Sequence, residues 1–245
     1  PFPRYLFGFG VAFHQGEGGN GFIGTSGFNY ALSGVDDTSG ASYGAEWAFF
    51  FFQYAFAAAA ATITSGAVAE RCTLTGYLAS VMLMVGLLYP VVVHWVWDGY
   101  GWASAFNTNT GDDGPLLGGQ IDFAGSGVVH MTGGLAALCG AAVLGPRNGR
   151  YGEDGKPLPM PGHSTTLSVL GTFILWLGWY GFNPGSTLGI TPSGYAQAAA
   201  RAVVTTTLAA ASGGITVCLL EKMRGSKTWD VGAVCNGILG GLVSI

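Results

Sequence analysis

The segment "DFAGSGVVHMTGGLAALCGAAVLG", from Asp122 to Gly145, decides the fold of this chain. A helix needs about 20 mostly apolar residues to cross a bilayer, and this segment is long and apolar enough to do so. It nevertheless opens on an acid and carries His130 eight residues further along. Because ionisable groups are costly inside a membrane and are rarely kept there without a role, the segment predicts both a membrane helix and a functional site.

The composition of the whole chain favours the same class of protein. Charged residues make up 9% of the chain and hydrophobic ones 49%, whereas soluble domains carry about 25% charged residues. The 43 glycines favour helices that pack closely through small residues. The net charge of −4 and the lack of a basic cluster argue against a nucleic-acid partner. The four cysteines have no CxxC spacing and are predicted to be buried free thiols rather than disulfides or metal ligands: Cys72, Cys139, Cys218 and Cys235.

Several other apolar runs have the length of a membrane span. The sequence predicts an all-α, polytopic membrane helix bundle of about six to seven helices in one transmembrane domain, residues 1–245. The expected spans are Glu46–Ala69, Leu74–Trp97, Asp122–Gly145, Thr165–Asn183 and Ser193–Leu220, with a partial one near Phe2–His14 and the start of another at Val231–Ile245.

The charges in the connecting loops alternate along the chain. Lysine and arginine concentrate in the loops at 66–74, 146–163 and 222–230, while the other loops carry aspartates or no charge. Basic loops of membrane proteins lie in the cytoplasm. These three loops are therefore predicted to be cytoplasmic.

This topology sets the depth of each candidate residue. His130 lies about 12 Å inside the outer surface, at about 1.5 Å per residue from Asp122, which is close to the bilayer midplane. Trp97 ends an outward-running helix, whereas Phe56 lies about ten residues into an inward-running one. The residues that the topology places in the outer half of one bundle are Phe56, Trp97, Asp122, His130, Phe182 and Ser186.

Each of these residues also has a purely structural interpretation. Asp122 can cap the helix that follows it, and its charge can also attract cations to the outer mouth. His130 can form a hydrogen bond in the core or accept one from a small N–H solute. Trp97 can belong to the interfacial aromatic belt or hold an ammonium-like cation on its face. Phe56 and Phe182 can pack in the core or against lipid, or form a gate.

Metal and enzyme chemistry are weakly supported. Asp122 and His130 are about 80° apart around a helix of about 3.6 residues per turn, so they do not form a same-face pair. His94 and Asp98 form the other pair, but a zinc site takes three or four ligands. Ser126 and His130 have the spacing of a nucleophile and a base, without a third orienting group. No metal, cofactor or enzymatic activity is expected.

Four blocks of the sequence share one resemblance. They are "DFAGSGVVHMTGGLAALCGAAVLGPRNGRY", "GAVAERC", "HWVWDGYGW" and "GWYGFNPGS". Their content, order and spacing resemble the ammonium transporter family, and the loops resemble its plant and algal branch. The similarity covers essentially the whole chain.

The resemblance implies a fold of eleven helices built from two inverted repeats and assembled as a homotrimer with one pore per subunit. This chain is expected to be a fragment that lacks both ends, running from within the second helix into the eighth. His130 corresponds to the first of two pore histidines. The second belongs to the tenth helix, which this sequence does not contain.

The resemblance also assigns roles to the remaining candidates. Trp97 and Ser186 correspond to an outer site that recruits ammonium, and Asp122 corresponds to the acid of that site, with a role in its structure and in deprotonation. Phe56 and Phe182 correspond to a stacked gate below it.

Together these roles predict a transporter for nitrogen uptake in the plasma membrane. The protein would recruit ammonium, deprotonate it and conduct ammonia, with or without a proton, through a hydrophobic pore lined by histidine. An ammonium sensor that signals through a C-terminal tail is the alternative.

Overall fold

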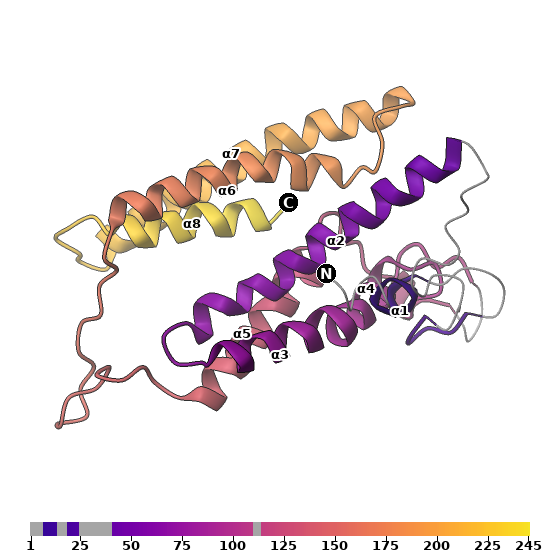
Figure 1. Ribbon diagram of the computed structural model, residues 1–245. Helices are drawn as coiled ribbons and strands as arrows, with labels where there is room; N and C mark the ends of the chain where they lie inside the picture. The colour runs from indigo at the N-terminus through magenta and orange to yellow at the C-terminus, as the bar shows by residue number, and fades with distance from the viewer. Residues whose placement is uncertain (1–6, 14–18, 25–40, 110–113) are drawn as a thin grey trace. The chain divides into compact units, whose positions relative to one another are not determined.

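The computed structural model describes residues 7–13, 19–24, 41–109 and 114–245, with side chains from residue 47 onward in the first long helix. These residues are helical or form loops, apart from isolated bridges such as the one between Ser104 and Gln120. The chain divides into two compact units, Pro1–Lys156 and Pro157–Ile245 (Figure 1). That both units belong to one transmembrane domain stays a prediction.

The first unit holds the segment from which the fold was inferred. Its helices are α1 (Phe9–Ala12), α2 (Ala41–Val68), α3 (Leu74–Leu83), α4 (Tyr89–Trp97) and α5 (Thr132–Leu144). Two π-helical turns, Met84–Leu88 and Ser126–Met131, lead into α4 and α5, and a short 3₁₀ turn covers Leu116–Gly118. Helices α2 and α5 pack on each other.

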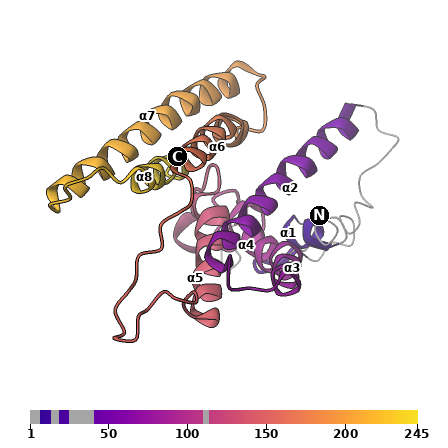
Figure 2. The ribbon, with the colours of Figure 1, turned by 60° about the vertical axis from the view of Figure 1, so that its left-hand side comes forward.

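The second unit is a three-helix bundle. It consists of α6 (Thr165–Gly185), α7 (Ser193–Met223) and α8 (Val231–Val243). These three helices run side by side in both views (Figure 1 and Figure 2).

Five stretches of helix among the described residues are long and apolar enough to cross a membrane. They are Trp47–Val68, Leu74–Trp97, Ser126–Leu144, Thr165–Gly185 and Ser193–Met223. These stretches confirm the five predicted spans, and α8 confirms the start of the run at Val231. Residues 7–13 of the partial span near Phe2–His14 are described and contain α1, and the rest of that span lies outside the described residues.

The second span contains an irregularity that the apolar pattern does not reveal. The π-helical turn Met84–Leu88 lies just ahead of Pro90. Proline has no backbone N–H and its ring crowds the preceding turn, and a π-helical turn is one way to accommodate such a break. The span therefore stays continuous from Leu74 to Trp97 without being a uniform α-helix.

Arginines join the two basic loops of the first unit. The Arg71 guanidinium donates to the carbonyl oxygens of Ala67 (2.9 Å from Nε) and Gly145. Arg147 pairs with Glu70 at 2.8 Å. These cations lie where α2 and α5 end, at the negative ends of the helix dipoles. The loops at 66–74 and 146–163 thus meet at one end of the unit, as alternate loops of a polytopic bundle should.

Gly133 sets the distance between α2 and α5. A Cβ added at Gly133 would lie 2.8 Å from the carbonyl oxygen of Ala60, whereas one added at Gly134 would meet nothing within 4 Å. We expect Gly133→Ala to push the helices apart, at a cost of about 1–3 kcal/mol, and to lower the unfolding temperature of the purified full-length protein. Gly134→Ala should be neutral or stabilising, since alanine favours helix by about 1 kcal/mol. Equal unfolding temperatures for the two variants would contradict this packing.

Candidate functional site

Asp122 caps the turn that carries His130. One carboxylate oxygen accepts hydrogen bonds from the backbone N–H groups of Gly125 (2.7 Å) and Ser126 (3.0 Å). The other accepts from Gly127 (3.0 Å) and Val128 (2.7 Å). The residue is only 7% exposed. The capping interpretation is confirmed, because the carboxylate satisfies four N–H groups that the start of a helix leaves without intrahelical partners.

The turn that follows the cap orients the His130 ring. Gly125 has a φ of 94°, in the left-handed region that glycine adopts readily. Its carbonyl oxygen accepts both the backbone N–H and the ring Nδ1 of His130, each at 3.0 Å. Since a carbonyl oxygen can only accept, Nδ1 carries a hydrogen in this contact. In a neutral imidazole, Nε2 is then the hydrogen-bond acceptor.

Trp97 is held against the same turn. Its indole Nε1 donates to the backbone carbonyl oxygen of Asp122 at 2.6 Å. The ring passes so close to Gly125 that a Cβ there would lie 3.3 Å from it. Its other neighbour is Phe56, with ring centroids 5.9 Å apart in an edge-on arrangement. The fold therefore brings Phe56, Trp97, Asp122 and His130 into one connected cluster.

The two remaining candidates lie in the second unit. Phe182 packs on Trp179 with ring centroids 5.6 Å apart. The Ser186 hydroxyl donates to the carbonyl oxygen of Phe182 at 2.9 Å, one turn earlier in α6. Phe182 and Ser186 belong to a different unit from Phe56 and Trp97. The stacking of Phe182 on Phe56 and the approach of Ser186 to Trp97 therefore stay predictions.

Gln53 is a buried polar residue that the sequence alone did not reveal. It is 4% exposed in the middle of α2, between Phe52 and Phe56, whose rings pack at 4.5 Å. Its side-chain oxygen Oε1 has no hydrogen-bond partner within the described residues. Buried polar atoms are normally paired, so this oxygen stands out as a buried acceptor that the described side chains leave unused. The signal was a lone amide inside an aromatic run, "FFFFQYAF".

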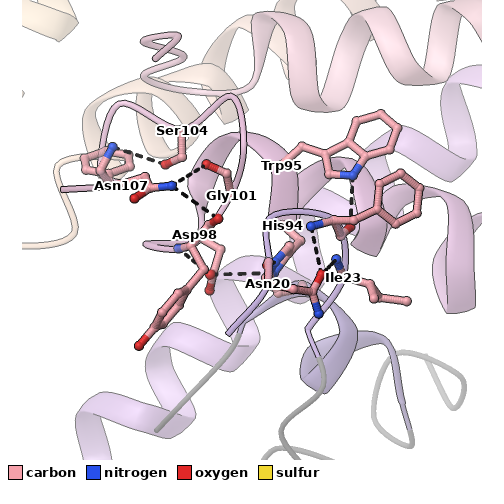
Figure 3. A network of polar contacts seen from close by, with 12 residues as sticks. Asn20, Ile23, His94, Trp95, Asp98, Gly101, Ser104 and Asn107 are labelled. Atoms are coloured by element: carbon pink, nitrogen blue, oxygen red, sulfur yellow. Dashed lines mark hydrogen bonds and ion pairs between the residues drawn. The ribbon is translucent and has the colours of Figure 1, made fainter. Parts of the chain in front are cut away.

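His94 and Asp98 form a structural network rather than a metal site (Figure 3). The buried His94 ring lies between two backbone carbonyl oxygens, that of Ala12 3.1 Å from Nδ1 and that of Asn20 2.8 Å from Nε2. Asp98 lies 3.6 Å from Nδ1 and accepts the backbone N–H of Tyr100. With a carbonyl oxygen opposite each ring nitrogen, His94 ties α4 to α1 and to the segment 19–24.

The same network extends into the loop after α4. The Asn107 side chain donates to the carbonyl oxygens of Tyr100 and Gly101, at 3.3 and 3.1 Å. The Ser104 hydroxyl accepts the backbone N–H of Phe106 at 3.1 Å (Figure 3). These contacts close the loop on itself, and the bond from the Ala103 N–H to the Trp95 carbonyl oxygen at 3.0 Å joins the loop to α4.

No cluster of three or more metal-ligating side chains occurs in the part of the chain that the structure describes. The four cysteines are free thiols, as predicted, but the expectation that all are buried is wrong, since only Cys235 is buried and Cys139 is exposed. The cluster around Trp97 consists of aromatic rings and hydrogen-bonded polar groups.

Comparison with known proteins identifies the family to which this site belongs. The sequence pattern described as the Ammonium Transporter Family matches residues 4–245. Ammonium transporter 1 member 2 of Arabidopsis thaliana is 47% identical over 250 residues, which are 98% of this chain and 47% of that protein. Ammonium transporter 1 member 2 of rice is 48% identical over 251 residues, 98% of this chain and 48% of the relative. The chain spans about half the length of these relatives.

Solved structures give the same result. A protein named "Sensor Amt Protein" superimposes with a TM-score of 0.81 at 34% identity, over 99% of this chain and 55% of its own. Mep2 of Saccharomyces cerevisiae superimposes with a TM-score of 0.76 at 32% identity, over 99% of this chain and 51% of its own. The matched family and its named relatives are membrane transporters, not enzymes. The chain belongs to the ammonium transporter family.

Proposed function

We propose that the protein recruits ammonium at its outer face, removes a proton from it and conducts ammonia past His130. The observation that carries the proposal is the connected cluster of the first unit. The Trp97 ring lies between the buried Phe56 ring and the capped turn at Asp122, and that turn orients His130. An aromatic face for a cation is thus joined to an acceptor for an N–H group.

The proposed mechanism separates a charged step from a neutral one. Ammonium binds as a cation on the face of Trp97, near the Ser186 hydroxyl. Carrying that charge through hydrocarbon costs at least about 2.5 kcal/mol, and far more in some treatments. Ammonium avoids this cost by releasing a proton, which either stays outside or travels separately, whereas a potassium ion has no proton to release. The neutral ammonia then passes the Phe56 and Phe182 gate.

His130 and Gln53 can accept N–H groups below the recruitment site. With Nδ1 bonded to Gly125, the neutral His130 ring accepts at Nε2, and the buried Gln53 oxygen is an acceptor in the same unit. Asp122 holds the turn in place instead of taking the proton, because each of its oxygens already accepts two backbone N–H groups. Protonation of Asp122 would weaken this cap.

Trp97→Leu tests the recruitment site. Loss of the aromatic face should raise the half-saturation concentration for methylammonium uptake by the full-length protein about five-fold or more, the range of a cation–π contact of about 1–2 kcal/mol. Trp95→Leu is the matched control, since its indole donates to the Phe22 carbonyl oxygen and packs on Trp102. An unaltered half-saturation in Trp97→Leu, with normal amounts of protein in the membrane, would count against the recruitment site.

The wider setting is inferred from the family. We infer a homotrimer in the plasma membrane that serves nitrogen uptake, with the loops at 66–74, 146–163 and 222–230 in the cytoplasm and both units in one domain. The contacts of Arg71 and Arg147 between two of these loops support the placing of both on one side.

A sensor is the second candidate, because the solved structure that superimposes with a TM-score of 0.81 is named "Sensor Amt Protein". A sensor would share the recruitment cluster and need not conduct. Reconstitution of the full-length protein in liposomes separates the two functions. Ammonium-driven flux supports the transporter, whereas binding without flux supports the sensor.

A further inference from the structure

The end of α6 is locally the weakest part of the proposed conduction site. Phe182 and Ser186 flank Pro184 and Gly185, the last residues of the helix. Proline removes one helical hydrogen bond and glycine disfavours helix by about 1 kcal/mol. The backbone then leaves the helix through tighter turns, such as the bond from the Ser186 N–H to the Asn183 carbonyl oxygen at 3.1 Å. Helix propensity alone therefore does not hold Phe182 and Ser186 in position.

Asn183 supplies tertiary contacts in this turn. It is 1% exposed, and its side-chain Nδ2 donates to the Thr206 hydroxyl oxygen of α7 and to the Leu242 carbonyl oxygen of α8, both at 3.1 Å. Thr206 and Leu242 are themselves fully buried. Both amide hydrogens are thus used, and one side chain joins all three helices of the second unit.

The two helices that Asn183 contacts are packed at close range. A Cβ added at Gly213 of α7 would overlap the carbonyl oxygen of Gly237 in α8, and one added at Gly241 would overlap that of Ala209. Gly237 and Gly241 have the spacing of small residues that let membrane helices approach closely. The Thr206 and Leu242 oxygens therefore lie on a pair of helices with little freedom to shift.

We propose that Asn183 is a positioning residue that fixes Phe182 and Ser186 on the α7–α8 pair. The inference rests on the proposed function, which gives those two residues their roles at the gate and the recruitment site. Without the bonds from Asn183, the turn interrupted by Pro184 is free to rotate, and the Ser186 hydroxyl loses its set position. The consequence for transport is weaker recruitment of ammonium.

A neighbouring network provides a control in the same helices. The Tyr180 hydroxyl bonds to the Thr207 hydroxyl at 2.7 Å and accepts the Trp176 indole N–H at 3.1 Å. This network joins α6 to α7 just before Phe182, and it does not involve the Asn183 side chain. Removal of the Thr207 hydroxyl thus removes a bond between the same two helices without touching Asn183.

Thr206→Val tests the proposal, because valine keeps the shape of threonine and removes the hydroxyl oxygen. In the full-length protein we expect the half-saturation for methylammonium uptake to rise about three- to ten-fold, the range for one buried hydrogen bond, with the maximal rate per transporter largely kept. Thr206→Ser, which restores the hydroxyl, and Thr207→Val should both stay near the wild-type value. A half-saturation in Thr206→Val equal to that of Thr206→Ser, or the same rise in Thr207→Val, would overturn the proposal.

Two further variants make every outcome decisive. If Thr206→Val does not reach the membrane, Thr206→Ala is measured in its place. If neither variant reaches the membrane, the Thr206 hydroxyl serves folding rather than positioning, and the proposal is overturned. Ser186→Ala separates the proposal from the function on which it rests. If Ser186→Ala shifts the half-saturation and Thr206→Val does not, positioning by Asn183 alone is wrong. If Ser186→Ala has no effect, the recruitment role of Ser186 is wrong.

Discussion

Replacing His130 by alanine should reduce ammonium flux through the full-length protein about ten-fold or more, or make the protein permeable to potassium. The ring is fixed by the bond from Nδ1 to the Gly125 carbonyl oxygen at 3.0 Å, which leaves Nε2 as an acceptor in the neutral form. Alanine removes that acceptor from a dry stretch of the path. A lost hydrogen bond to a solute in such surroundings costs about 1–3 kcal/mol, and each 1.4 kcal/mol is about ten-fold.

The measurement compares ammonium and potassium currents of the wild type and the variant at equal amounts of protein in the membrane. His163→Ala is the control, because His163 is exposed in the loop before α6 and the same substitution there should change neither current. Unchanged flux together with unchanged discrimination against potassium in His130→Ala would remove His130 from the conduction path.

The spans could be predicted because a run of apolar residues is visible directly in the sequence. A run of apolar residues has nowhere to lie but a membrane or a core, and the limits of α6 and α7 followed from it to within a few residues. The cap at Asp122 was also predictable, because an acid directly before such a run meets free N–H groups. Proximity in sequence was sufficient for both predictions.

Contacts between helices were not predictable in the same way. The hydrogen bond from Trp97 to the Asp122 carbonyl oxygen joins residues 25 positions apart, and no periodicity in either segment encodes it. Depth placed Trp97 and Asp122 at the same level but could not show that they touch. Gln53 was overlooked for a related reason, since burial of one amide depends on the helices around it.

The π-helical turn at Ser126–Met131 shows a further limit. A regular helix from Asp122 to His130 was expected from the sequence, with an angle of about 80° between the two side chains. In the structure, Gly125 adopts a left-handed conformation and its carbonyl oxygen bonds to the N–H groups of both Val129 and His130. The angle of about 80° therefore does not apply to the turn that the structure shows, and the relation between the Asp122 and His130 side chains stays a prediction.

Asp122→Asn should have the other large effect, on the folded state itself. The carboxylate satisfies four N–H groups, and the bonds to Gly125 and Val128 are buried. Asparagine keeps one acceptor oxygen and turns an NH₂ group towards the two N–H donors that the second oxygen served. Each buried donor left without a partner costs about 1–3 kcal/mol, which is a large part of the roughly 5–15 kcal/mol that stabilises a typical protein.

The same substitution at Asp230 shows how much an ordinary helix cap contributes to the unfolding temperature. Asp230 accepts a single exposed bond, from the Ala233 N–H at 3.0 Å, so Asp230→Asn should lower the unfolding temperature of the purified full-length protein only slightly. Asp122→Asn should lower it much further and, because Trp97 bonds to the Asp122 backbone, should also raise the half-saturation for methylammonium in any protein that folds. Equal unfolding temperatures for the two variants would show that the four bonds of Asp122 do not hold the His130 turn in place. A variant whose unfolding temperature is unchanged but whose half-saturation rises would instead assign the loss of recruitment to the negative charge of Asp122 rather than to its cap.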